Sequence, residues 1–197
     1  MDVRQRLLDA AAKLYAEVGY RGATTRRIAQ EAGVNELSLF RHFGSKGELL
    51  HTAIGACRPG SMDFSLPVVP VDPVAELGEW VTRRVAVMRE HQGLIRTALG
   101  EAEEHPELIR PSEAPMVQAG AALSVYLGRL RERGFTSAEF DPGAAASLLL
   151  STLFVDAIVR DVMPGAFGPD AERDAAEYLR IFLRGVGVEI REPVRKA

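Results

Sequence analysis

The stretch TTRRIAQEAGVNELSLFRHF, residues 24–43, decides the fold. Its apolar residues recur at helical spacing on both sides of Gly33, which predicts two short helices joined by a tight turn. Thr24 and Asn35 supply side-chain oxygens of the kind that cap first helical turns. Ala29 is small enough for the helices to cross closely, and Gly33 readily adopts the positive φ that the turn needs. The stretch therefore predicts a helix-turn-helix, the motif that places its second helix in the major groove of DNA.

Helical periodicity continues on both sides of this stretch. Upstream, apolar residues from Val3 to Tyr15 mark one face of a helix that Gly19 is expected to end. Downstream, Ser45 is placed to cap a helix that begins at Lys46. Because no alternating strand pattern and no internal repeat is found, we expect an all-α fold of about nine helices.

The helical pattern stops between residues 58 and 73, where four prolines occur. Such a segment is typical of a linker, so we predict a helix-turn-helix domain over 1–57, a linker over 58–72 and a second helical domain over 73–190. The charged residues 191–197 are expected to form a tail. Helices of the second domain are predicted over 73–92, 93–104, from Pro111 or Pro115 to 134, 142–163 and 171–187.

Charge divides unevenly between these two parts of the chain. Residues 1–58 carry nine Lys and Arg against six Asp and Glu, a net of +3, whereas residues 59–197 carry fifteen against twenty-one, a net of −6. A basic head on an acidic body is expected when only one end meets phosphate. Cys57 is the one cysteine, so no internal disulfide forms, and a reducing cytoplasm fits best. Neither a secretory signal nor an apolar run of about 20 residues is present, so no membrane association is expected.

Residues 4–52 resemble the DNA-binding domain of the tetracycline-repressor family of regulators. The resemblance includes Gly19-Tyr20, the Thr24-Thr25 start, Ile28-Ala29, Ala32-Gly33-Val34 and the run LFRHFGSK over 39–46. It implies a three-helix helix-turn-helix head that binds a double-stranded DNA operator. It also implies a helical body that binds a small-molecule effector and pairs two copies into a homodimer. On this basis we expect a repressor released from a palindromic operator by an apolar effector, without any cofactor.

The resemblance assigns DNA-binding roles to specific residues of the head. Those expected to contact the phosphate backbone are Thr24, Thr25, Arg26, Arg27 and Lys46. Those expected on the recognition helix, where base edges are read, are Asn35, Glu36, Leu37, Ser38, Phe40, Arg41 and His42.

Three of these positions leave alternatives open. Phe40 replaces a tyrosine common in the family, and a phenyl ring lacks the hydroxyl that would donate to phosphate. Glu36 would repel phosphate, so we expect it to accept from a cytosine amino group or to pair with Arg27 or Arg41. Leu37 is interpreted either as a core residue or as a contact to a thymine methyl group.

The body contains apolar and aromatic residues at helical spacing that fit two roles. Candidates for an effector pocket are Trp80, Val81, Val85, Met88, Leu99, Val117, Tyr126, Leu150 and Phe154. Candidates for a four-helix dimer interface are Leu148, Phe154, Ala157, Ile158, Tyr178, Leu179, Phe182 and Val186. Either set also fits the core of a single chain.

Other classes of function find less support. Glu101 and His105 lie one helical turn apart and resemble part of a metal or acid–base site, but a solvated helix end before Pro106 is the favoured interpretation. No nucleophile motif or phosphate-binding glycine loop is present, so we expect no enzyme, no catalytic residue and no bound metal. The alternatives kept are a helical ligand-binding or scaffolding dimer that does not act on DNA, and an activator.

Overall fold

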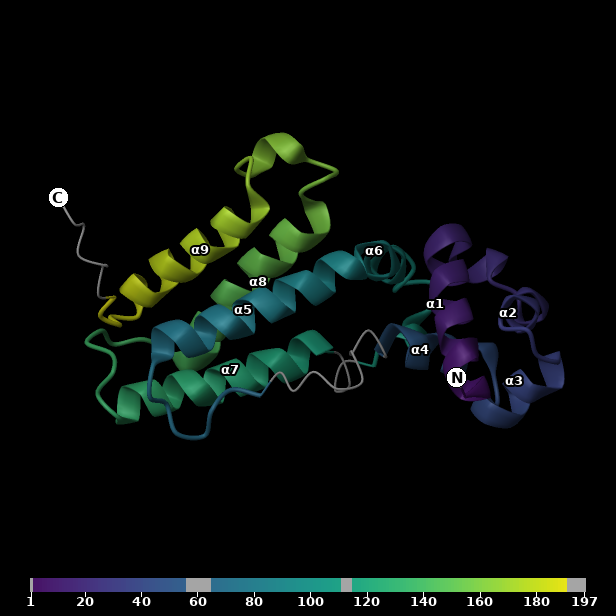
Figure 1. The fold of residues 1–197 in the computed structure, drawn as a ribbon, viewed down its shortest axis with the longest axis horizontal. Coiled ribbons are helices and arrows are strands. Elements are labelled where there is room, and N and C mark those ends of the chain that lie inside the picture. Colours follow the sequence, from purple (N-terminus) through teal and green to yellow (C-terminus); the bar gives the residue numbers. More distant parts are fainter. Residues whose placement is uncertain (1, 56–64, 111–114, 191–197) are drawn as a thin grey trace. The chain divides into compact units, whose positions relative to one another are not determined.

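The computed structural model describes residues 2–55, 65–110 and 115–190. Within these ranges the chain forms nine α-helices and two short 3-10 turns (Figure 1), and its only β-type pairing is an isolated bridge between Thr136 and Val188. The predicted all-α class is confirmed. The elements are α1 (Val3–Gly22), α2 (Thr25–Glu31), α3 (Glu36–Phe43), α4 (Lys46–Gly55), α5 (Pro73–Glu90), α6 (Gln92–Gly100), η1 (Pro106–Leu108), α7 (Pro115–Glu132), α8 (Pro142–Val159), η3 (Pro164–Ala166) and α9 (Ala171–Gly185).

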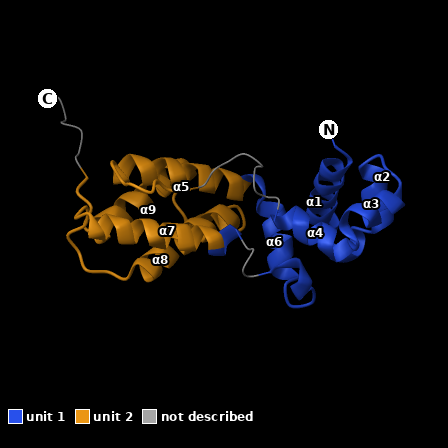
Figure 2. Ribbon diagram, turned by 90° about the horizontal axis from the view of Figure 1, so that it is seen from below, with its two compact units in different colours: residues 1–62, 90–117 blue, residues 63–89, 118–197 orange. Residues whose placement is uncertain are grey.

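The chain divides into two compact units, coloured separately in Figure 2. Unit 1 combines residues 1–62 with 90–117, and unit 2 combines 63–89 with 118–197. This division differs from the one predicted at 58–72, because α6 packs on α1 and η1 packs on α4. Residues 92–108 thus belong with the head. Residues 56–64 of the predicted linker and the tail 191–197 lie outside the described residues.

α1 has a kink at Gly19, the glycine that was expected to end the helix. Gly19 has φ 67° and ψ −174°, a conformation in the left-handed half of the map that side-chain-bearing residues rarely adopt. The helix resumes beyond the break and closes at Gly22, where Ala23 N–H donates to the Gly19 carbonyl at 3.0 Å. The predicted stop at Gly19 is therefore a change of direction, and one more turn follows it.

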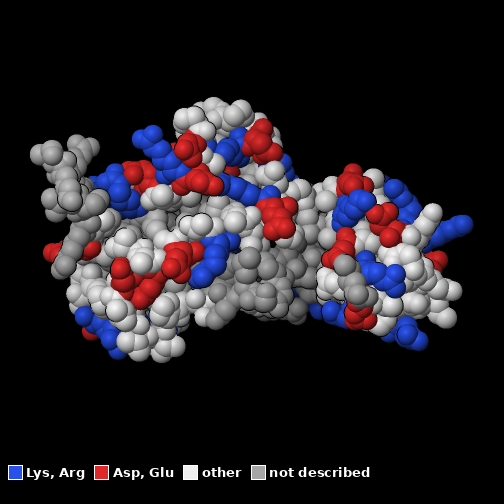
Figure 3. Space-filling view, viewed as in Figure 1, with Lys and Arg blue, Asp and Glu red and all other residues white. Residues whose placement is uncertain are grey.

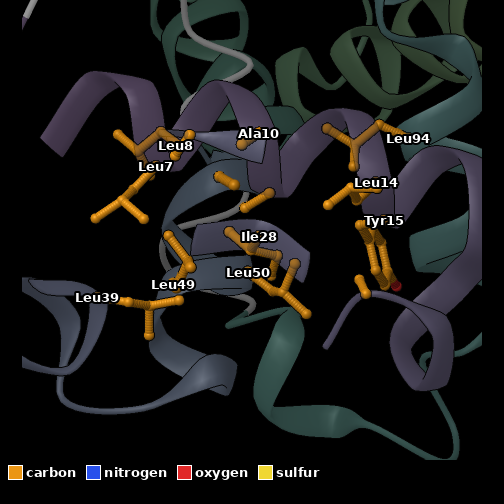
Figure 4. Packing of buried hydrophobic residues seen from close by; sticks show 14 of the residues in the cluster. Leu7, Leu8, Ala10, Leu14, Tyr15, Ile28, Leu39, Leu49, Leu50 and Leu94 are labelled. Atoms are coloured by element: carbon orange, nitrogen blue, oxygen red, sulfur yellow. The ribbon is translucent and has the colours of Figure 1, made fainter. Parts of the chain in front are cut away.

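The core of unit 1 is assembled from five helices (Figure 4). Leu7, Leu14 and their neighbours on α1 point toward Ile28 of α2, Leu39 of α3 and Leu49 of α4. Leu94 of α6 packs into the same cluster. Each fully buried leucine contributes on the order of 2 kcal/mol through removal of apolar surface from water. Burial of one face of α1 therefore holds the short helices α2 and α3, which are too short to be stable alone.

Unit 2 is tied together by a buried carboxylate. Asp156 of α8 is 2% exposed and accepts hydrogen bonds from Arg89 of α5 at 3.2 Å, Arg160 at 3.0 Å and Tyr178 of α9 at 3.0 Å. Arg160 also pairs with Asp174 at 2.8 Å. Burial alone would raise the pKa of Asp156, but the hydrogen bonds from Arg160 and Tyr178 outweigh it and hold the pKa below its ordinary value. The cluster fastens α5, α8 and α9 at one point.

α8 is unusually apolar for a helix of this unit. Of the helices in the described ranges, it alone is long and apolar enough to cross a membrane, with a mean hydropathy of 1.7 over Pro142–Val159. A core helix has the same properties, and α8 packs against α9 and carries the ion-paired Asp156. The sequence interpretation of residues 148–159 as a buried helix holds for one side of α8; its other side is exposed, as described below.

We expect Asp156→Asn to lower the free energy of unfolding by about 3 kcal/mol at pH 7, because it removes the carboxylate that pairs with the partly buried Arg89 and one of the two that pair with Arg160. A carboxyl whose pKa is lowered by folding stabilises above its unfolded pKa, near 3.8, and loses that contribution as the pH falls through its folded pKa. The difference from wild type should therefore shrink at pH 3. Urea unfolding at both pH values measures it. The exposed Glu139→Gln is the control, and equal stability of the two variants at pH 7 would contradict the assignment.

Candidate nucleic-acid interface

The helix-turn-helix is shaped by two side-chain caps and one glycine. Thr24 Oγ1 accepts from the Arg27 N–H at 3.3 Å, and Asn35 Oδ1 accepts from the Leu37 N–H at 2.9 Å, so α2 and α3 begin where the sequence predicts. Gly33 has φ 63° in the turn between them. Ala29 of α2 is buried, and α2 packs against α3.

α3 is anchored through one buried side chain. Leu39 is fully buried, and Val34 and Phe43 pack against the same core at the two ends of the helix. Leu37 is 73% exposed, and the structure thus rules out a core role for it in this chain. Because α3 is attached along a single line, the rest of its surface remains accessible.

The predicted DNA-binding residues line this accessible surface. Those exposed to solvent are Thr24, Arg26, Arg27, Asn35, Leu37, Phe40, Arg41 and His42. Those partly buried are Thr25, Glu36, Ser38 and Lys46. In Figure 3, Lys and Arg side chains project from the part of unit 1 that carries α2 and α3. The surface is therefore suited to a polyanion.

Glu36 makes a different contact from those expected. Its Oε1 accepts a hydrogen bond from the Thr25 hydroxyl at 2.5 Å, and Arg27 instead donates to the Gly22 carbonyl at 3.0 Å. The side chain at the start of α3 faces the start of α2, so a hydroxyl is the nearest donor. The expected Glu36–Arg27 pair is wrong for this structure. The hydrogen bond from Thr25 leaves the charge of the Glu36 carboxylate in place but fixes the orientation of the side chain.

Lys46 is held by a residue that the sequence interpretation did not single out. Its ammonium donates to the Tyr20 carbonyl oxygen and lies 3.7 Å from the centroid of the Tyr20 ring. Burial lowers the pKa of Lys46. Tyr20 itself is bonded to Glu101 and stacked on His105, which the sequence left as a solvated helix end or part of a metal site. The only sequence signal for these contacts was the Gly19-Tyr20 pair that matches the family. Nothing in the sequence marks Glu101 and His105 as partners of Tyr20.

The metal interpretation of this segment has no geometric support. The Glu101 carboxylate is occupied by the Tyr20 N–H, and His105 Nδ1 lies 3.4 Å from Glu107. Across the described ranges no three His, Cys, Asp or Glu side chains are grouped to hold a metal ion.

The predicted effector-pocket residues fall into two groups. The six that are buried in unit 2 are Trp80, Val81, Val85, Met88, Tyr126 and Leu150, and Phe154 of α8 is partly buried. Leu99 and Val117 are about half exposed, and Leu99 belongs to α6 of unit 1, so these two stand apart from the others. A groove of about 490 Å³ along α9 contains none of the nine residues, since its lining is Pro169, Asp170, Arg173, Asp174, Glu177 and Arg180.

Most of the predicted dimer residues lie inside unit 2. Those buried there are Ala157, Ile158, Leu179, Phe182 and Val186, and those partly buried are Phe154 and Tyr178. Leu148 alone of the set is exposed, at 66%. Periodicity does not separate an apolar stripe that faces the interior of one chain from one that faces outward, because both have the same spacing along a helix.

Comparisons with known proteins agree with the geometry of the head. Residues 7–53 match the model of the bacterial regulatory proteins of the tetR family. The chain is 31% identical over 131 residues to the HTH-type transcriptional repressor SCO4008 of Streptomyces coelicolor, covering 66% of each protein. It is 27% identical to the HTH-type transcriptional repressor KstR2 of Mycobacterium tuberculosis over 94% of both chains.

Solved structures show the same fold over nearly the whole chain. SmeT, the repressor of the Stenotrophomonas maltophilia multidrug efflux pump SmeDEF, matches with a TM-score of 0.74 and 23% identity over 98% of this chain and 96% of that one. A TetR-family regulator from Mesorhizobium loti matches with a TM-score of 0.72 and 20% identity, covering 94% and 97%.

A capped helix-turn-helix with exposed Arg and Asn side chains, joined to a helical body, defines a DNA-binding transcriptional regulator. Within that class, the chain belongs to the tetR family of bacterial regulatory proteins.

We expect Asn35→Ala to lower the free energy of unfolding of the head by about 1 kcal/mol, because the Leu37 N–H loses its cap. Asn35→Asp keeps an acceptor oxygen and should retain wild-type stability. Gln30→Ala, on the exposed side of α2, is the control for side-chain truncation. Denaturant unfolding monitored by circular dichroism measures all three, and equal stability of the Ala and Asp variants would count against the cap.

Proposed function

We propose that this regulator is a repressor that binds a palindromic operator as a homodimer and is released by an apolar small molecule. The observation that carries the DNA part is α3, whose Leu39 is buried while Leu37, Arg41 and His42 face solvent. Base-reading helices need this attachment along one side. Several relatives of similar sequence are named as transcriptional repressors, which supports the direction of regulation.

An apolar stripe on unit 2 supports pairing of two copies. Leu148 and Val155 are exposed seven residues apart on α8, and Ile181 is 60% exposed on α9, against which α8 packs. Two such helix pairs related by a two-fold axis bury these side chains in a four-helix interface. Two recognition helices about 34 Å apart then meet successive major grooves on one side of the DNA.

The buried part of the predicted effector site supports a small apolar ligand. Trp80 and Tyr126 are fully buried in unit 2, and the Tyr126 hydroxyl bonds to Glu76 of α5. An aromatic and aliphatic lining with a few polar groups is typical of small-molecule sites. The structurally similar SmeT has been solved in complex with triclosan, an observation about that protein that supports the proposal here.

Release follows from a shift between two states of the dimer. In one state the two recognition helices have the spacing that the operator needs, and in the other they do not. A ligand that binds the second state more tightly lowers operator affinity, and the ratio of its affinities for the two states sets the limit of the effect. No chemistry is required, so we infer a binding protein rather than an enzyme, acting on DNA in the cytoplasm.

We expect selection from random DNA duplexes to enrich a palindrome. Arg27→Ala should weaken binding to that site about tenfold and flatten the dependence of log K on log salt by about one, because one phosphate contact is lost. The exposed Arg133→Ala removes the same charge from unit 2 and should bind as wild type does. Fluorescence anisotropy over a range of salt concentrations measures both. No enriched sequence at moderate salt would refute the proposed function.

We expect Leu148→Glu to convert the dimer to a monomer, because it places a charge in the apolar interface, whereas the secondary structure persists. Val125→Glu introduces the same change at an exposed position of α7 and should remain dimeric. Light scattering coupled to size-exclusion chromatography gives the mass. A dimeric Leu148→Glu variant would place the interface elsewhere.

A further inference from the structure

Tyr20 is held at its backbone by a residue that lies 81 positions later in the chain. The Tyr20 N–H follows the break at Gly19 and donates to both carboxylate oxygens of Glu101, at 3.0 and 3.1 Å. Glu101 comes directly after α6 and belongs to unit 1 with Tyr20. A hydrogen bond to a charged acceptor is stronger than one between neutral groups, so this contact fixes the Tyr20 peptide firmly.

The other side of the same residue holds Lys46. The Tyr20 carbonyl accepts from the Lys46 ammonium, and the ring centroid lies 3.7 Å from Nζ. The His105 ring stacks on Tyr20 with centroids 3.7 Å apart and planes inclined by 25°. Tyr20 therefore connects Glu101 and His105, which follow α6, to the first residue of α4.

Two glycines of the head lie close to the segment formed by residues 101–108. A Cβ on Gly19 would lie 2.7 Å from Glu101 Oε1, closer than real contacts allow. A Cβ on Gly47, next to Lys46, would lie 3.4 Å from the Cγ of Glu107. His51 of α4 adds a bond to the Leu108 carbonyl at 3.0 Å. Residues 101–108 are thus fitted closely to α1 and α4, and the Glu101 contact is part of that fit.

We propose that Glu101 is a positioning residue for operator binding, which acts by fixing Tyr20 so that Tyr20 directs the Lys46 ammonium toward a DNA phosphate. The inference rests on the proposed operator binding. An ammonium group has three donors, and the Tyr20 carbonyl takes one, which leaves two for phosphate oxygens. With its long side chain held at one point, Lys46 loses less conformational freedom when it meets the phosphate.

Charge supports the same arrangement. Burial lowers the pKa of Lys46, and the negative charge of Glu101 opposes that shift. The carboxylate therefore favours the charged ammonium that a phosphate contact needs, in addition to fixing the Tyr20 backbone.

The test compares three single variants on the selected operator. Glu101→Ala should weaken binding about tenfold and flatten the salt dependence by about one, as expected when one phosphate contact is lost. Glu101→Gln keeps an oxygen that accepts from the Tyr20 N–H and should recover most of the affinity. Glu103→Ala removes the same charge from an exposed position of the same segment and should match wild type in affinity and salt slope.

A double variant separates positioning from general stability. Lys46→Ala alone should weaken binding by a similar factor, and adding it to Glu101→Ala should cause little further loss, because both act through one contact. Losses that multiply, or a Glu101→Ala variant that behaves like Glu103→Ala, would overturn the inference while leaving operator binding intact. Absence of specific binding by the wild-type chain would overturn the proposed function itself. If Glu101→Ala does not fold, Glu101→Asp takes its place, because the shorter side chain draws the carboxylate away from the Tyr20 N–H. Weaker binding that Lys46→Ala does not weaken further supports positioning, and wild-type affinity refutes it.

Discussion

The burial of Leu39 in the core of unit 1 is the contact on which the DNA-facing surface depends. It is the one fully buried residue of an eight-residue helix, so α3 is fixed in place while its remaining side chains stay available. Helices of this length have little stability of their own, and their caps contribute only about 1 kcal/mol each. The recognition surface therefore exists because α1, α4 and α6 supply an apolar core for Leu39 and Ile28 to enter.

The same core explains why the head includes residues far along the chain. α6 and η1 pack on α1 and α4, although they follow α5 and precede most of α7, which belong to unit 2. The chain thus leaves unit 2, contributes to the head and returns. Residues 92–100 of α6 follow α5 directly in the sequence, although the two helices belong to different units.

In unit 2, different residues of α8 stabilise the unit and face solvent. One side carries Asp156, whose ionic bonds to Arg89 and Arg160 join three helices, and the other side exposes Leu148 and Val155. The buried ion cluster fixes the relative orientation of α8 and α9 in one chain, because each partner satisfies specific geometry. A fixed helix pair is what an interface between two copies requires, since a flexible pair would lose conformational entropy on association.

The sequence by itself determined the all-α class, the helix-turn-helix over 24–43 and its two caps, because these depend on local properties: the period of apolar residues, short side-chain oxygens before a helix, and glycine at positive φ. Only the tertiary structure decided which partner each polar residue takes and which apolar face is buried. Glu36 bonds to Thr25 rather than to an arginine, Lys46 bonds to Tyr20, whose N–H bonds to Glu101, and Ile158 and Phe182 are buried in unit 2. These outcomes join residues 11 to 81 positions apart, and no periodicity in the sequence records such distances.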